Sequence, residues 1–195
     1  MLILSACIEQ STDNSSTNTN SPKSSLESLD STPKSEPSPS SLYKPGSAEG
    51  PAQNVPFPAM PAEARKFTED GAKSFTLYYF DLLNYAIDST DTKEIERISE
   101  DDCTICYKSI IDEAEEIKKA HRWQVGGKHQ AVVIDSHISG KNIAIVTVEF
   151  TSDVGKVYSA PSVVHEKLQK QDATSLAFDL SYNKGWTVHK IMGVE

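Results

Sequence analysis

The 195-residue chain lacks both a long apolar run and a basic cluster, and each absence excludes a class of protein. No stretch reaches the roughly 18 apolar residues that a membrane-spanning helix needs. The 28 acidic residues outnumber the 19 lysines and arginines, so the formal net charge is −9. A nucleic-acid-binding surface needs clustered basic side chains to neutralise phosphates, and the chain has no such run interleaved with aromatic residues. We therefore do not expect nucleic acid to be a partner.

Motifs for metals, cofactors and catalysis are also missing. The five histidines stand singly, without the His-x-His or His-x-x-x-His spacing of a metal site. Gly126-Gly127 is followed by neither Lys-Ser/Thr nor a helical pattern, so it indicates a strand bulge or a turn rather than a phosphate loop. No pair of acids, histidines or nucleophiles has a diagnostic spacing. The sequence therefore assigns no catalytic residue, no metal ligand and no cofactor.

Only three cysteines are present, and the first of them ends the pattern Leu4-Ser5-Ala6-Cys7. An apolar residue, two small residues and a cysteine are typical of a lipoprotein signal, in which the cysteine is acylated and becomes the first residue of the mature protein. A secretory signal has a basic region and an apolar region of about 7–15 residues before the cleavage site, whereas six residues precede Cys7. One alternative is a cytosolic protein with a chance match. The other is an internal start at Met1, with the signal beginning upstream.

We favour the lipoprotein interpretation because a low-complexity tail and a folded domain follow Cys7. Residues 1–6 are then the remnant of a lipoprotein signal peptide, and the acylated Cys7, carrying fatty acids such as palmitate, holds the protein in a lipid bilayer. Two or more acyl chains are needed for stable anchoring. This interpretation places the protein in the cell envelope, on the extracytoplasmic face of the cell membrane.

The tail has too few large apolar residues to build a core. Between Ser11 and Ser41 only Leu26 and Leu29 are large and apolar, among many Ser, Thr, Asn and Pro residues. Such a composition buries too little apolar surface to offset the entropy lost on ordering. We expect residues 7–42 to be a disordered spacer. The segment 43–60 carries several aromatic and apolar residues among its prolines, and it is expected to form an extended strap docked on the folded domain.

The folded domain is expected to span residues 61–195. Apolar residues at three- and four-residue steps predict helices over 63–88, 92–98 and 103–121. Alternating patterns then predict strands over 123–127, 129–138, 142–151, 157–168, 176–182 and 186–194, with Pro161 interrupting the fourth and a turn at 183–185 before the last. Helices followed by strands favour an α+β fold, with the N-terminal helices packed in one strongly curved antiparallel sheet.

Several stretches give the chain a resemblance to known proteins over residues 43–195. They are Tyr43-Lys44-Pro45, the segment 50–56 (Gly-Pro-Ala-Gln-Asn-Val-Pro), Leu83-Asn84-Tyr85-Ala86, the segment 102–106 (Asp-Cys-Thr-Ile-Cys) and the segment 122–127 (Arg-Trp-Gln-Val-Gly-Gly). In these the chain resembles a family of actinobacterial lipoproteins of unknown function. The order of elements is similar to the nuclear-transport-factor-2-like fold, a cystatin-like α+β cone. The resemblance implies architecture and export, and it carries no catalytic residues.

Cys103 and Cys106 form a Cys-x-x-Cys motif at the start of a predicted helix. In an exported protein a disulfide is the simplest interpretation. A thiol redox site is the alternative, because a helix N-terminus lowers the pKa of a thiol. Against it, Asp101 and Asp102 directly precede the motif and would raise that pKa. Zinc is the least favoured, since no second pair of cysteines follows.

Four residues are expected to line the interior of the cone: Tyr79, Trp123, His129 and His165. The favoured function is a non-enzymatic binding module that takes a small apolar ligand or an envelope protein. One alternative is a cell-envelope enzyme using the same cavity, which would need a buried His or Asp within hydrogen-bonding distance of a second polar group. A thiol redox protein acting through Cys103 and Cys106 is the less favoured alternative.

Overall fold

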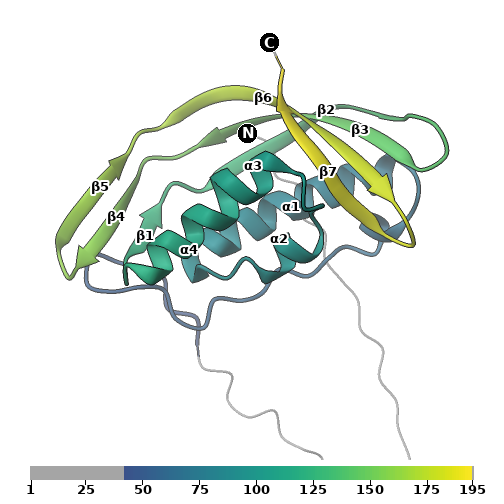
Figure 1. The fold of residues 1–195 in the computed structure, drawn as a ribbon. Helices are drawn as coiled ribbons and strands as arrows, with labels where there is room; N and C mark the ends of the chain where they lie inside the picture. The colour runs from purple at the N-terminus through teal and green to yellow at the C-terminus, as the bar shows by residue number, and fades with distance from the viewer. Residues whose placement is uncertain (1–41, 195) are drawn as a thin grey trace, which may run out of the picture. The chain divides into compact units, whose positions relative to one another are not determined.

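The computed structural model describes residues 42–194 (Figure 1). Cys7, the signal remnant 1–6 and the spacer up to residue 41 lie outside the described residues. The helical elements are η1 (Glu63–Arg65, a 3-10 helix), α1 (Glu69–Ser89), α2 (Lys93–Arg97), α3 (Thr104–Cys106), η2 (Tyr107–Ile111, a π-helix) and α4 (Asp112–Lys119). The strands are β1 (Trp123–Gly126), β2 (His129–Ile138), β3 (Ile143–Ser152), β4 (Gly155–Ala160), β5 (Val163–Leu168), β6 (Gln171–Tyr182) and β7 (Trp186–Gly193). The predicted order of helices followed by strands is confirmed.

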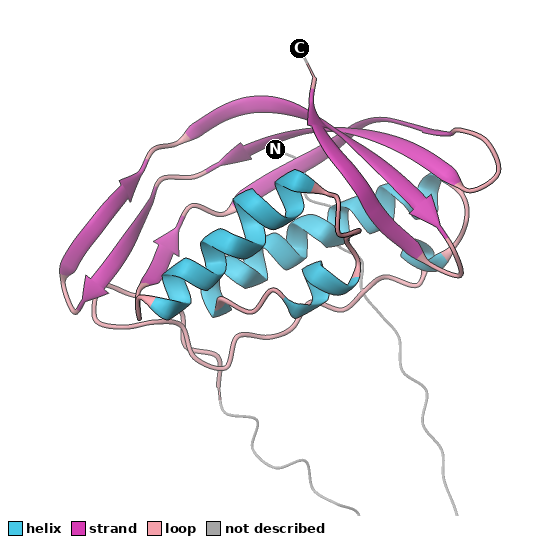
Figure 2. Cartoon of the chain, viewed as in Figure 1, coloured by secondary structure: helices cyan, strands magenta, loops and turns pink. Residues whose placement is uncertain are grey.

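The expected cone with one strongly curved sheet is wrong. Strand accounts for 40% of the structure against 29% for helix, and the strands form two antiparallel sheets. The smaller sheet has the order β1-β4-β5, and the larger has the order β2-β3-β6-β7. Figure 2 shows the helices together on one side of these strands. The fold is therefore a two-sheet arrangement of mainly β character, and not an α+β cone of the nuclear-transport-factor-2-like kind.

The two sheets are separate because the strands are interrupted at three neighbouring positions that lie side by side in the structure. The first break lies between β1 and β2, the second between β3 and β4, and the third between β5 and β6. On one side of this line Gly155 pairs with both Gly126 and Leu168, and on the other side Ser152 pairs with both His129 and Gln171. We call this level the sheet break. The hydrogen-bonded ladders of β1-β4-β5 and of β2-β3-β6 therefore end here instead of continuing into each other.

Gly126 shows why the backbone turns at the sheet break. Its φ of +77° lies in the left-handed region, where a side chain is strained. A Cβ on this residue would lie 2.5 Å from the carbonyl oxygen of Val154, so the two chain segments approach more closely than any other residue allows. The next residue, Gly127, donates its backbone N–H to the same carbonyl at 3.0 Å. The glycine pair is thus the turn that the sequence indicates.

Helix α1 supplies most of the aromatic core. Thr68 is its N-cap, and the Thr68 hydroxyl accepts a hydrogen bond from the N–H of Gly71 at 2.9 Å. This cap starts the helix six residues later than predicted, because Thr68 itself has an extended backbone. The buried face of α1 packs against β3 and β6 in one cluster that includes Phe75, Tyr79, Leu82, Val146, Val148, Phe178 and Leu180.

Among the helices of residues 42–194, none combines the length and the apolar character that a membrane span requires.

Residues 43–60 lie along the domain without regular secondary structure beyond isolated bridges. The indole N–H of Trp123 on β1 donates to the carbonyl of Ser47 at 2.7 Å. The carbonyl of Ala48 accepts from the N–H of Ser162 in the β4–β5 turn, also at 2.7 Å. The ring of Phe57 meets that of Tyr85 on α1 edge to face. These contacts connect the strap to β1, to the β4–β5 turn and to α1.

Candidate functional site

A cavity of about 540 Å³ lies where the sheet break meets α1, η2 and α4. Its size falls in the range of small-molecule sites, roughly 300–1,000 Å³. Residues from all three breaks line it, including Gly127, Asp153 and Gln169. The cavity therefore exists because the two sheets do not continue into each other.

The helical wall of the cavity contains an unusual segment. In η2 the backbone widens to a π-helix, and the N–H of Asp112 donates to the carbonyl of Tyr107, five residues earlier. A π-segment adds one residue to a turn, which changes the face that the following helix presents; such segments occur often at functional sites. Ser109 and Ile110 of η2, together with Glu113, line the cavity.

One part of the lining is apolar and comes from three elements. Its members are aliphatic side chains of α1, of η2 with α4, and of β5: Leu83, Ala86, Ile87, Ile110, Ala114, Ile117 and Leu168. Their side chains are partly or fully buried in the structure. This surface can hold the apolar part of a ligand.

The other part of the lining is polar and carries more negative than positive charge. Its charged members are Glu113 on α4, Asp153 at the sheet break, and Glu166 and Lys167 on β5. Partial burial raises the pKa of Glu113, and the nearby carboxylates of Glu166 and Glu116 raise it further. The cavity thus brings like charges together from α4 and β5.

Asn84 of α1 fixes the beginning of β2 at the cavity. Its side-chain amide donates to the carbonyl of His129 and accepts from the N–H of the same residue, both at 2.8 Å. Lys128 donates to the backbone carbonyl of Asn84 and forms an ion pair with Asp88 at 2.8 Å. These bonds attach the sheet break to α1 and hold the His129 ring at the cavity wall.

The His129 ring itself is held by packing rather than by polar contacts. It meets the rings of Phe80 and Phe150 edge to face. Its Nδ1 is buried and has no hydrogen-bond partner within residues 42–194. Burial lowers the pKa of His129, and the charge of Lys128 lowers it further, so the ring is neutral at physiological pH. The ring lacks the polar partner that would orient it for proton transfer.

Of the four residues predicted to line a cavity, the structure brings only His129 to it. Tyr79 is fully buried in the core beside Phe178. Trp123 stacks on Tyr158, and its indole N–H donates to the carbonyl of Ser47 in the strap. His165 is exposed on β5. The prediction assumes the interior of a cone, and the two-sheet arrangement does not bring these four residues together.

A comparison with protein families shows to which family the chain belongs. Family DUF6318, a family of unknown function, matches residues 41–191. The chain belongs to this family. The expected membership of a family of unknown function is confirmed, and the match carries no information on lipid anchoring.

Two further comparisons add little to the family match. A search of curated proteins gave no match. Among solved structures, the chain is similar to the crystal structure of the intermembrane space region of the chloroplast protein ARC6, at 10% identity and a TM-score of 0.46. The similar region covers 66% of this chain and 98% of that one. A likeness of this degree carries no argument about function.

The DUF6318 domain contains the predicted disulfide between Cys103 and Cys106, with an S–S distance of 2.07 Å. Both cysteines are fully buried at the start of α3. Thiol–disulfide exchange requires a thiolate to reach a sulfur of the bond. The burial therefore favours a structural disulfide over a redox site.

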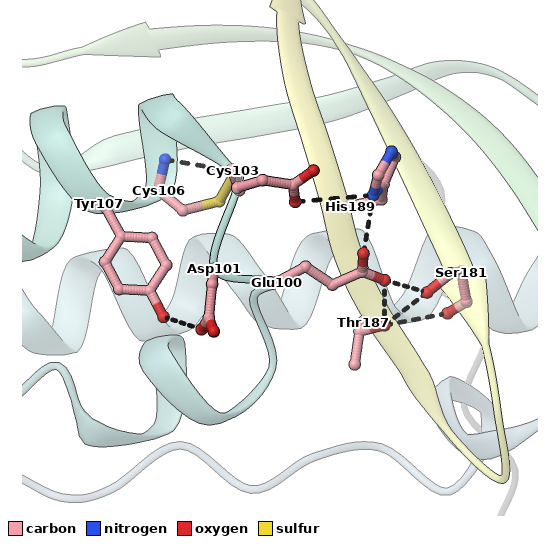
Figure 3. A network of polar contacts seen from close by, with 9 residues as sticks. Glu100, Asp101, Cys103, Cys106, Tyr107, Ser181, Thr187 and His189 are labelled. Carbon is pink, nitrogen blue, oxygen red and sulfur yellow. Dashed lines mark hydrogen bonds and ion pairs between the residues drawn. A yellow bond between two sulfur atoms is a disulfide. The ribbon is translucent and has the colours of Figure 1, made fainter.

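Near the disulfide, Glu100 joins the loop before α3 to β6 and β7 (Figure 3). Its carboxylate accepts from the hydroxyl of Ser181 at 2.5 Å and from that of Thr187 at 3.3 Å, and it pairs with Nδ1 of His189 at 2.7 Å. Because the carboxylate lies between the hydroxyls and the imidazole, this is not the nucleophile–base–acid order of a hydrolytic triad. Glu100 instead fastens the loop to the sheet.

The same cluster has the only set of three side chains in the described part of the chain that could hold a metal ion: Glu100, Asp102 and His189. Their ligand atoms lie within 4.8 Å of one another. The hydrogen bond and charge of Glu100 raise the pKa of His189, and the carboxylates of Asp102 and Asp179 add to this effect. The contacts of Glu100 with Ser181, Thr187 and His189 account for the geometry of this cluster without a metal ion.

Proposed function

We propose that the protein is a lipid-anchored, extracytoplasmic binding protein of the cell envelope, and that its ligand is a small molecule held in the cavity at the sheet break. The observation that carries the proposal is the cavity of about 540 Å³, which combines one apolar and one polar wall. Concave sites with an apolar lining and a few converging polar groups are the usual form of a ligand site. The π-helical segment in its wall supports this assignment.

The proposal is non-enzymatic because the cavity offers no pair of groups arranged for proton transfer or nucleophilic attack. The histidine in its wall has an unpartnered ring. The network of Glu100, Ser181 and His189 has the wrong order for a triad. Binding needs only the shape and the lining that the cavity has.

A fluorescent probe tests the binding function. N-phenyl-1-naphthylamine, a neutral apolar dye that brightens in an apolar environment, is titrated into the full-length protein. Ala114 lines the cavity, whereas Ala120, at the end of the same helix, does not. We expect dye binding in the wild type and in Ala120→Trp, and at least tenfold weaker binding in Ala114→Trp, whose indole fills the cavity.

Circular dichroism and melting temperature show whether both variants are folded. If Ala114→Trp does not fold, Gln171→Trp fills the cavity from the opposite wall. Absence of dye binding to the wild type, or equal binding to folded cavity-filled and control variants, would refute the proposal.

The anchor is tested separately. The protein is expressed from its natural gene, with any upstream coding sequence, and its N-terminal peptide is analysed by mass spectrometry. We expect a diacylglyceryl thioether on Cys7 and recovery in the membrane fraction, with release to the soluble fraction in Cys7→Ser. An unmodified Met1 in the soluble fraction would contradict the anchor without affecting the binding function.

A further inference from the structure

The charges around the cavity are unbalanced in one direction. Three carboxylates, those of Glu113, Asp153 and Glu166, line it together with one ammonium group, that of Lys167. None of the four takes part in an ion pair within residues 42–194, whereas other surface acids such as Asp70 and Glu115 are paired with lysines one turn away. The three carboxylates at the cavity therefore have no ion-pair partner among the residues that the structure describes.

Two of these acids line the cavity from different elements and lie close enough to interact electrostatically. Glu113 comes from α4 and Glu166 from β5, and the proximity of Glu166 contributes to the raised pKa of Glu113. Like charges held close together in a partly desolvated site repel each other. A cation placed between them removes this repulsion and gives each carboxylate a partner.

Aliphatic side chains complete the site beside these acids. Ile110 and Ala114 are on the same helical wall as Glu113, and Leu168 is two residues from Glu166 on the same strand segment. A ligand that places a positive charge between the carboxylates therefore has apolar surface available for the rest of its body. An anion would meet three carboxylates, whereas a neutral apolar molecule would use the aliphatic wall alone.

We propose that the cavity is specific for amphipathic organic cations, in which an ammonium group lies between Glu113 and Glu166 and an alkyl or ring portion lies on the aliphatic wall. This inference rests on the proposed binding function and names the ligand class. Glu113 and Glu166 act as the charge-selecting residues. The aliphatic wall gives affinity without charge selectivity.

Competition between two molecules of equal chain length tests the selectivity. Decylammonium and decanoate carry opposite charges at pH 7.5, because an ammonium group titrates near pH 10.4 and a carboxyl near pH 4.3. Each displaces N-phenyl-1-naphthylamine from the full-length protein at concentrations below micelle formation. We expect half-displacement by decylammonium at a concentration at least tenfold lower than by decanoate.

Matched charge variants locate the effect. Glu113→Gln and Glu116→Gln remove the same charge from the same helix, but Glu116 does not line the cavity. We expect Glu113→Gln to reduce the preference for decylammonium over decanoate at least fivefold. Glu116→Gln should change the preference less than twofold. Raising the salt concentration should weaken decylammonium binding more than dye binding.

Two outcomes overturn the inference while leaving the binding function intact. One is dye binding that depends on the cavity, combined with equal displacement by the two competitors or stronger displacement by decanoate. The other is an equal effect of the two glutamine variants, which would assign the preference to the overall negative charge of the protein. Dye binding that is absent or insensitive to cavity filling removes both the function and the inference.

Discussion

Reduction of the disulfide between Cys103 and Cys106 is a quantitative test of how α3 is held. The bond closes a loop of four residues, since the cysteines are three positions apart. The chain-entropy relation for a cross-link of this length gives about 6 cal/mol/K, or about 2 kcal/mol at 25 °C. We therefore expect reduction to lower the free energy of unfolding by about 2 kcal/mol. For a protein of this size the melting temperature should fall by about 4–8 °C.

The structure gives a reason why the loss should not be larger. The segment that contains the disulfide is also held by the Glu100 contacts to β6 and β7 and by the backbone bond from the N–H of Glu100 to the carbonyl of Val188 at 2.9 Å. The hydroxyl of Tyr107 adds a bond to Asp101 at 3.2 Å. These contacts remain when the sulfur atoms are reduced, so α3 should stay folded.

The assay is equilibrium unfolding in urea with and without a phosphine reductant, because buried sulfurs are reduced only through opening of the structure. The double variant Cys103→Ala/Cys106→Ala should be insensitive to the reductant. It should be about 1 kcal/mol less stable than the reduced wild type, because two buried sulfur atoms are lost. A reduction effect below about 0.5 kcal/mol, or above about 4 kcal/mol, would contradict the view of a local cross-link.

Two further substitutions test the attachment of the sheets. Asn84→Ala leaves the partly buried N–H and C=O of His129 without their partners, so the free energy of unfolding should fall by roughly 2–3 kcal/mol. The control Asn183→Ala, in an exposed turn, should change it by less than about 0.5 kcal/mol. Urea unfolding measures both changes. In the second test His189→Gln removes the ion pair with Glu100. This ion pair raises the pKa of His189 and is one of the causes of the lowered pKa of Glu100. A histidine whose pKa is raised in the folded state stabilises the protein below about pH 6.5, and this contribution is lost as the pH rises through the folded-state pKa. A carboxyl group whose pKa is lowered in the folded state stabilises the protein above about pH 4.5, and this contribution is lost as the pH falls. The wild type should therefore exceed His189→Gln in thermal stability by about 0.5 kcal/mol near pH 5.5 and by much less at pH 9, and a difference that grows with pH would contradict the ion pair.

The strands and the disulfide were accessible from the sequence because their signals are local. The alternation over residues 129–138 predicts β2 with its observed bounds. The prediction of one strand over 157–168, interrupted or edged by Pro161, is wrong, because β4 and β5 form a hairpin that turns at Pro161 and Ser162. The Cys-x-x-Cys spacing, in a chain expected to be exported, predicts the disulfide that is observed. In each case neighbouring residues carry the information.

The division into two sheets was not accessible, because it depends on three segments breaking at one level. Gly126 and Gly127 mark the first break with positive φ angles. The breaks at residues 153–154 and 169–170 have no comparable signal, since Asp, Val, Gln and Lys occur in many continuous strands. Only the strand register shows that these positions align. A single curved sheet was therefore the simpler expectation from the sequence.

The charged residues of the cavity were missed for a related reason. A regular helical period over 103–121 places Glu113 on the solvent face with Glu115 and Glu116. Glu113 follows Ile110 by three residues and directly precedes Ala114, so it borders the apolar stripe, and in the structure it lines the cavity with both of them. The π-helical turn at Tyr107–Ile111 comes just before it. No residue type in this segment signals a π-helix.

The failure of the cone prediction and the presence of the cavity have the same physical cause. In one continuous sheet the ladder would run from β1 into β2 and from β4 into β3, and side chains of neighbouring strands would fill the space between sheet and helix. At the sheet break the ladders end, and Gln124 and Gln171 come to line an open volume instead. Asn84 then becomes necessary, because it satisfies backbone groups of His129 at the edge of the sheet. The same interruption of the strand ladders thus separates the two sheets, opens the cavity and creates the need for the Asn84 contacts.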